Sequence, residues 1–136
     1  MATLHLSRAS ADDLPAIVEI MFKTYTDPIA RDFCLGKDNP EGHKGLVERF
    51  AKTMRENPAD YWIKIVDQSD NRIIAATNYR IYPTIAPDHA NENDRSTPWL
   101  KDEPERQRMI SGIWDMALDS RVKHFSHPYI GDQQTS

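Results

Sequence analysis

The sequence predicts a mixed α/β (α+β) domain in which a mainly antiparallel three-stranded sheet is packed by three helices. Three observations support this prediction. Two β-rich runs at 61–66 and 72–82 flank a short polar turn, and three other segments carry apolar residues at helical spacing. The length of 136 residues suits one domain, and 39% hydrophobic with 28% charged residues can form a core. We therefore expect one domain over 1–136 without internal repeats.

The chain begins with a short strand and a helix start. Leu4 and Leu6 alternate with polar residues, which is typical of a strand. Ser10 or Asp12 can accept hydrogen bonds from the free amides of a new helix. Pro15 then falls in the first turn, where its missing N–H costs little. This pattern predicts a helix beginning near residue 13.

Two helices are expected before the hairpin. The first carries one apolar face, formed by Leu14, Ile17, Val18, Met21 and Tyr25. Asp27 before Pro28 ends it, and residues 29–40 make a connection with a short helical turn. The second helix has the apolar face Leu46, Val47, Phe50 and Met54, and Asn57 before Pro58 ends it.

A hairpin follows, with strands at 61–66 and 72–82 joined by the polar turn 67–71. Residues 84–104 lack periodicity and are expected to form a long surface loop. A third helix has Ile110, Ile113, Trp114, Ala117 and Arg121 on one face, and His127-Pro128 ends it. We expect the polar residues 127–136 to be frayed.

The composition disfavours several classes of function. The net charge of −4 and the lack of a basic aromatic cluster argue against nucleic-acid binding. No apolar run is long enough for a membrane span, and no N-terminal signal peptide is visible. Cys34 is the single cysteine, so no internal disulfide is possible. These features favour a cytoplasmic or nuclear protein without membrane partners.

Local motifs give weak chemical signals. His124 and His127 lack the third ligand that a metal site needs, so no metal is expected. The Gly42-His43-Lys44-Gly45 segment matches a short RNA-binding loop, but a loose helix start is the better interpretation. Cys34 is interpreted as a small packing residue rather than a nucleophile. Trp99 is either a loop anchor or a lid over a pocket.

The order of elements and three segments resemble the GNAT (Gcn5-related) N-acetyltransferase superfamily. Arg8, Ala9, Asp12 or Asp13, and Ile17 approximate a family opening that starts with Arg and Ala and places Asp before Ile. The continuation to Asp27-Pro28 and Arg31 resembles a fungal branch of the family. The segment Arg72-Ile73-Ile74-Ala75 resembles the family's third strand, except that Ala75 replaces the customary glycine.

The resemblance covers about residues 3 to 125 and implies a partial GNAT-like fold. In it, 84–125 would be an insertion between the third and fourth strands. The family uses acetyl-CoA as cofactor and a small-molecule or peptide amine as acceptor. Its cofactor loop, Gln/Arg-x-x-Gly-x-Gly/Ala, follows the fourth strand, and the sequence ends at Ser136 before such a loop. We therefore expect no catalytic and no cofactor-binding residue here, and poor binding of acetyl-CoA by this chain.

By position, the resemblance implies four residues on the acceptor side: Tyr25, Asp27, Phe33 and Tyr79. Simple packing is the alternative for Tyr25 and Tyr79. The chain is accordingly interpreted as the catalytically incomplete N-terminal region of a GNAT-like N-acetyltransferase. The alternative is a non-catalytic interaction or dimerisation module, in which the open sheet edge pairs with another copy. A shortened gene product remains a third interpretation.

Overall fold

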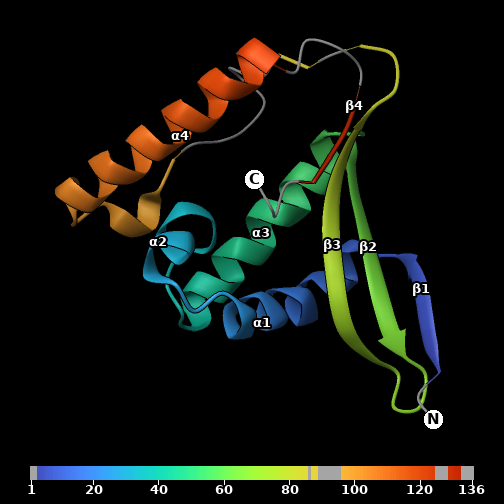
Figure 1. Cartoon of the computed structure of the whole chain (residues 1–136). Coiled ribbons are helices and arrows are strands. Elements are labelled where there is room, and N and C mark those ends of the chain that lie inside the picture. The colour runs from blue at the N-terminus through green and yellow to red at the C-terminus, as the bar shows by residue number, and fades with distance from the viewer. Residues whose placement is uncertain (1–2, 86, 89–95, 125–128, 133–136) are drawn as a thin grey trace.

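The computed structural model describes residues 3–85, 87–88, 96–124 and 129–132. Helices and strands alternate along the chain in the following order (Figure 1): β1 Leu4–Arg8, the 3-10 turn η1 Ala11–Asp13, α1 Leu14–Thr24, the single turn α2 Pro28–Ala30, the π-helical turn η2 Arg31–Leu35, α3 Pro40–Glu56, β2 Asp60–Asp67, β3 Arg72–Tyr82, the 3-10 turn η3 Pro98–Leu100, α4 Pro104–His124 and β4 Tyr129–Asp132.

Four antiparallel strands form the sheet within the described residues, in the order β1-β2-β3-β4. The predicted hairpin of β2 and β3 is present, with a register shift between Ile65 and Val66. Asn71 adopts a positive φ of 56° in the turn, a conformation that asparagine tolerates better than most residues. The mixed α/β prediction is therefore confirmed.

The fourth strand was not predicted. Tyr129–Asp132 pair with Tyr79–Tyr82 of β3, so the expectation of a frayed tail at 127–136 is wrong for these four residues. The remaining tail residues lie outside the described ones. Strand β4 follows the loop and α4 in the chain, and we call the loop and α4, which lie between β3 and β4, the insertion. The pairing also covers part of the β3 edge that the sequence analysis expected to be open.

The helix starts follow the sequence signals with one correction. Ser10 and Asp13, rather than Asp12, form the reciprocal capping pair, in which Ser10 N donates to Asp13 Oδ2 at 2.8 Å. Pro15 lies in the first turn of α1. Asp27 accepts from the amides of Ile29 and Ala30 and so caps α2. The predicted loop at 84–104 contains the turn η3, while 86 and 89–95 lie outside the described residues.

The core lies between one face of the sheet and the helices α1 and α3. It consists of buried apolar residues, among them Leu14, Ile17, Val18, Phe22, Leu35, Leu46 and Trp62. Phe50 of α3 packs on Trp62 of β2, with ring centroids 5.0 Å apart. Each such side chain contributes about 1.5–3 kcal/mol when fully buried, before conformational entropy is subtracted. The face of the sheet that carries Trp62 is therefore the covered one.

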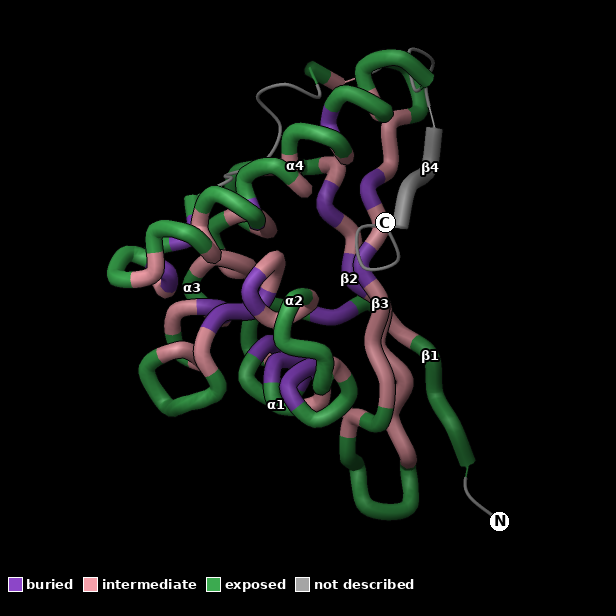
Figure 2. The backbone as a smooth tube through the Cα atoms, turned by 60° about the vertical axis from the view of Figure 1, so that its left-hand side comes forward, coloured by how far each residue is buried: buried purple, intermediate pink, exposed green. Residues whose placement is uncertain are grey.

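The opposite face of the sheet is covered by no described element (Figure 1). Residues alternate between faces along a strand, so Ile65 points away from the helices and its partner Leu6 lies beside it. Leu4 is 57% exposed, Leu6 64% and Ile74 41%. Figure 2 shows β1 as an exposed outer strand. An apolar face thus remains in contact with solvent in the described chain.

Helix α4 stands apart from the core and is exposed over most of its length (Figure 2). Its buried residues are Ile110 and Leu118, while Met116 is 76% exposed. It rests on the α2–η2 segment rather than on the sheet (Figure 1). Among the described helices, none is long and apolar enough to cross a membrane.

Candidate functional site

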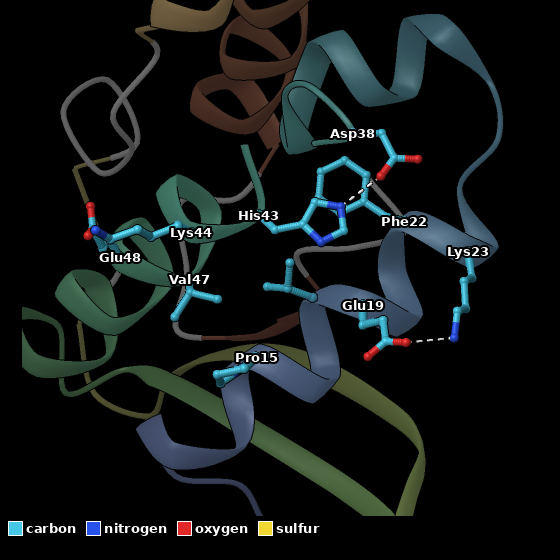
Figure 3. A pocket seen from close by; sticks show the side chains of 10 residues that line it. Pro15, Glu19, Phe22, Lys23, Asp38, His43, Lys44, Val47 and Glu48 are labelled. Carbon is cyan, nitrogen blue, oxygen red and sulfur yellow. Dashed lines mark hydrogen bonds and ion pairs between the residues drawn. The ribbon is translucent and has the colours of Figure 1, made fainter. Parts of the chain in front are cut away.

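Two hollows of the described surface carry a stacked pair of rings beside polar side chains. The first is an open groove of about 900 Å³ between α1 and α3. In Figure 3, His43 stacks on Phe22, with ring centroids 4.1 Å apart and planes at 10°. His43 Nε2 lies 2.7 Å from Asp38 Oδ1, so this carboxylate orients the imidazole. No serine, threonine or cysteine lines this groove, so His43 has no nucleophile there to activate.

The residues of this groove also show where the Gly42-His43-Lys44-Gly45 segment lies in the fold. Gly42 and Gly45 lie in the first two turns of α3, and His43 between them packs against α1. The motif is therefore part of a helix rather than an exposed loop, as the helix-start interpretation expected. Gly42 N donates to Asn39 Oδ1 at 2.7 Å, which caps α3.

The second hollow, which we call the tryptophan pocket, lies between the sheet, α3 and the insertion. Its volume is about 540 Å³, within the range of small-molecule sites. It is lined by aromatic side chains from five elements: Phe33 of η2, Phe50 of α3, Trp62 of β2, Trp99 of η3 and Trp114 of α4. Its polar residues include Asp60, Asn78 and Arg80. It joins an apolar wall to a few converging polar groups and is our candidate site.

The polar floor of the pocket is built around Asp60, whose side chain is 3% exposed. Its carboxylate accepts from Trp62 Nε1, Asn78 Nδ2 and Arg80 Nε, each at 3.0 Å. Asp60 and Arg80 are direct partners in the β2–β3 register. The buried charge is thus paired and hydrogen-bonded, which is the arrangement that makes burial of a carboxylate tolerable.

The aromatic wall is held by contacts from the insertion. Trp114 stacks on Phe33, with ring centroids 4.3 Å apart. Trp99 Nε1 donates to the carbonyl of Asp32 at 3.0 Å, and the guanidinium of Arg49 lies 4.2 Å from the centroid of the Trp99 ring. Trp99 therefore anchors its segment, in agreement with the loop-anchor interpretation, and it also lines the pocket.

Ion pairs connect the start of α4 to η2 and to the residue Lys37 after it. Lys37 Nζ lies 2.6 Å from Glu103 Oε1, and Arg106 binds both Glu103 and Asp32. Hydrogen bonds from Lys37 and Arg106 lower the pKa of the Glu103 carboxyl below its usual value. Asp32 is 5% exposed and receives Arg106 on its carboxylate and Trp99 on its carbonyl. The insertion is thus tied to η2 by several independent contacts.

The structure brings only one of the four predicted acceptor-side residues to the tryptophan pocket. Phe33 lines it. Tyr25 is half-buried against the hydrophobic core, as the packing alternative expected. The carboxylate of Asp27 accepts hydrogen bonds from two amides of α2 and caps that turn. Tyr79 lies between Asn78 and Arg80 on β3, so it points to the opposite face of the sheet.

Sequence reasoning missed the polar floor and the pairing of Phe33 with Trp114. Asp60, Asn78 and Arg80 are polar residues on strands, and such residues usually face solvent. The available signal was their alternation: Asp60, Trp62, Asn78 and Arg80 all share the parity of the core-facing positions. A charged pair at those positions indicates a buried ion pair.

Cys34 also lines the tryptophan pocket, but its thiol is inert. Burial raises the pKa of the Cys34 thiol from 9.0 to about 11, against a small opposing effect of Arg49. Its Sγ donates to the carbonyl of Ala30 at 3.0 Å. The reactive thiolate is therefore scarce at neutral pH. Across the part of the chain that the structure describes, no cluster of three metal-ligating side chains occurs.

Comparison of the chain with protein-family models, with curated proteins and with solved structures found no match. The resemblance to GNAT enzymes therefore depends on the sequence alone.

Proposed function

We propose that the chain forms the acceptor-binding region of a GNAT-like N-acetyltransferase. The observation that carries this proposal is the topology. One strand, two main helices and a hairpin are followed by an insertion, and β4 then pairs antiparallel with β3. As far as the inserted helix, this is the order that the sequence resemblance implies; β4 after it was not expected within this chain. The tryptophan pocket lies beside η2, in the connection that follows the first helix, where the family places its acceptor.

A pyrophosphate needs free backbone amides at a helix start. In α2 the amides of Ile29 and Ala30 already donate to Asp27, and in α3 the amide of Gly42 donates to Asn39. These two helix starts are therefore poor sites for the phosphates of acetyl-CoA. In this proposal the described residues supply walls that hold and orient an amine.

Two measurements test the proposal. The chain of 136 residues should show no saturable rise in melting temperature with acetyl-CoA. The product of its gene, expressed with any coding sequence that adjoins this segment, should release CoA from acetyl-CoA only when an amine is present. Absence of acetyl transfer from that product across a broad amine panel would count against the proposal, as would saturable cofactor binding by the 136-residue chain.

Self-association is the second candidate function, and the exposed apolar sheet face favours it. Leu4 and Leu6 lie on an edge strand whose outer side is unpaired within the described chain. Edge strands with exposed apolar residues pair with other chains unless something blocks them. A second copy of this chain is the occupant that we propose, because an antiparallel strand can pair with itself across a twofold axis.

A further inference from the structure

One polar atom of the tryptophan pocket has no protein partner. Asn78 is 5% exposed and lines the pocket. Its Nδ2 donates to Asp60 Oδ1 at 3.0 Å and to the carbonyl of Tyr61 at 3.4 Å. Because those two groups only accept, the orientation of the amide is fixed. Asn78 Oδ1 receives no hydrogen bond from any residue that the structure describes.

This oxygen is not among the buried side-chain atoms without a partner in the described chain, so it is open to solvent in the pocket. A ligand that displaces water from it without offering a donor would lose that hydrogen bond. The other polar groups of the floor offer no remedy. Trp62 Nε1 and Arg80 Nε are both directed at Asp60. A molecule that occupies the pocket and carries an N–H group would satisfy Asn78 Oδ1. The floor therefore selects a hydrogen-bond donor.

The walls select an aromatic group. Phe33, Trp99 and Trp114 line the same pocket as Asn78 and present apolar ring surface to it. Rings pack against such surfaces in offset-stacked or edge-to-face geometry, which adds to the hydrophobic gain. A volume of about 540 Å³ accommodates a ring with a short chain.

We propose that the tryptophan pocket binds a primary amine attached to an aromatic ring, with the ring against Phe33, Trp99 and Trp114 and the amine donating to Asn78 Oδ1. The inference rests on the proposed function in one respect, that this amine is the acetyl acceptor. Binding itself needs no cofactor, so it can be measured on the chain as it is.

The experiment follows the tryptophan fluorescence of the protein during titration with three probes. Phenethylamine has both ring and amine, butylamine lacks the ring, and 2-phenylethyl methyl ether lacks the donor. We expect saturable binding of phenethylamine and binding at least about tenfold weaker for the other two, which corresponds to about 1.4 kcal/mol for each missing contact. Equal binding of the ether would overturn the role of Asn78, and equal binding of butylamine that of the aromatic wall.

Two variants on one helix locate the site. Trp114→Ala removes a wall residue and should weaken phenethylamine binding by about tenfold. Met116→Ala changes a residue of α4 that is 76% exposed and does not line the pocket, and it should leave binding unchanged. Circular dichroism checks that both variants fold. An equal loss in the two variants, or no saturable binding by the unaltered protein, would refute the inference.

The outcomes separate the two proposals. If phenethylamine binds in the pocket but the extended gene product transfers no acetyl group to any amine, the proposed function fails and the binding site stands. If acetyl transfer occurs to amines without a ring and phenethylamine does not bind, the function stands and this site assignment fails.

Discussion

At the scale of single residues, Gly42 is the position with the least space. A Cβ at Gly42 would lie 1.9 Å from the carbonyl oxygen of Lys37, which is backbone and cannot swing away. Gly45, one turn later in the same helix, has nothing within 4 Å of its would-be Cβ. The two glycines therefore have opposite roles although the sequence presents them as one motif.

We predict opposite effects of alanine at these two sites. Gly42→Ala should lower the free energy of unfolding by about 1–3 kcal/mol because the loop before α3 must move. Gly45→Ala should raise it by up to about 1 kcal/mol because alanine is the better helix former. Urea unfolding of both variants measures this. A stabilising Gly42→Ala would show that the contact with Lys37 is absent in solution.

The Asp13 carboxylate links the first turn to the sheet and gives stability a pH dependence. Burial alone would raise its pKa, but hydrogen bonds from Lys64 and Ser10 together lower the pKa of Asp13 below 3.8. Asp13 Oδ2 lies 2.8 Å from Lys64 Nζ, and the two side chains are 18% and 21% exposed. A lowered pKa in the folded state stabilises the fold above pH 3.8, and this contribution is lost as the pH falls through the folded value.

Asp13→Asn should therefore cost about 1 kcal/mol at pH 6, the size of a lost helix cap, and less at pH 3. Asp12→Asn is the matched control, since Asp12 is exposed in the same turn and Lys64 donates to Asp13 instead. Urea midpoints at the two pH values test the expectation. Equal losses from Asp13→Asn at both would contradict it.

At the scale of elements, the insertion depends on Arg106. Arg106 joins the first turn of α4 to the buried carboxylate of Asp32, next to the Trp99 anchor. Without it, the buried Asp32 carboxylate loses this partner, and the start of α4 loses one of its links to η2. Local opening of α4 should then become more frequent, since few other contacts hold it.

We predict that Arg106→Met speeds chymotrypsin cleavage within α4 severalfold, because local opening exposes the chain to the protease. Arg108→Met is the control, because Arg108 is exposed in the same turn. The fragments are identified by mass spectrometry. Equal rates for the two variants would mean that the remaining contacts, such as Phe33 with Trp114, suffice to hold the helix.

Local signals in the sequence predicted most elements but not how the site is assembled. Asp27-Pro28, Asn57-Pro58 and the turn 67–71 each limit the backbone near themselves, so the boundaries there are close to the observed ones. The pairing of Asp60 with Arg80 and the stacking of Phe33 on Trp114 join residues far apart in the chain. No local propensity encodes such contacts. Only the pairing of Asp60 with Arg80 had a signal in the sequence, which was the alternation of residues along the strands.

At the scale of the whole molecule, one face of the sheet is uncovered and apolar, so we expect the protein to self-associate. We predict that the average mass measured by analytical ultracentrifugation rises with protein concentration. The double variant Leu4→Ser with Leu6→Ser should remain monomeric, because both side chains are more than half exposed and lie on the edge strand. Met109→Ser, an exposed apolar site on α4, is the control. A monomer at all concentrations would rule out this second candidate function.

The position of β4 also has a consequence for the order of folding. Tyr129 pairs with Tyr82, yet the whole insertion separates them along the chain, whereas β2 and β3 are joined by a short turn. Closing the longer loop has the larger entropic cost, and β4 gains few pairs in return. The hairpin can therefore form early, and β4 should be the last strand to dock and the first to release its amide protons to deuterium.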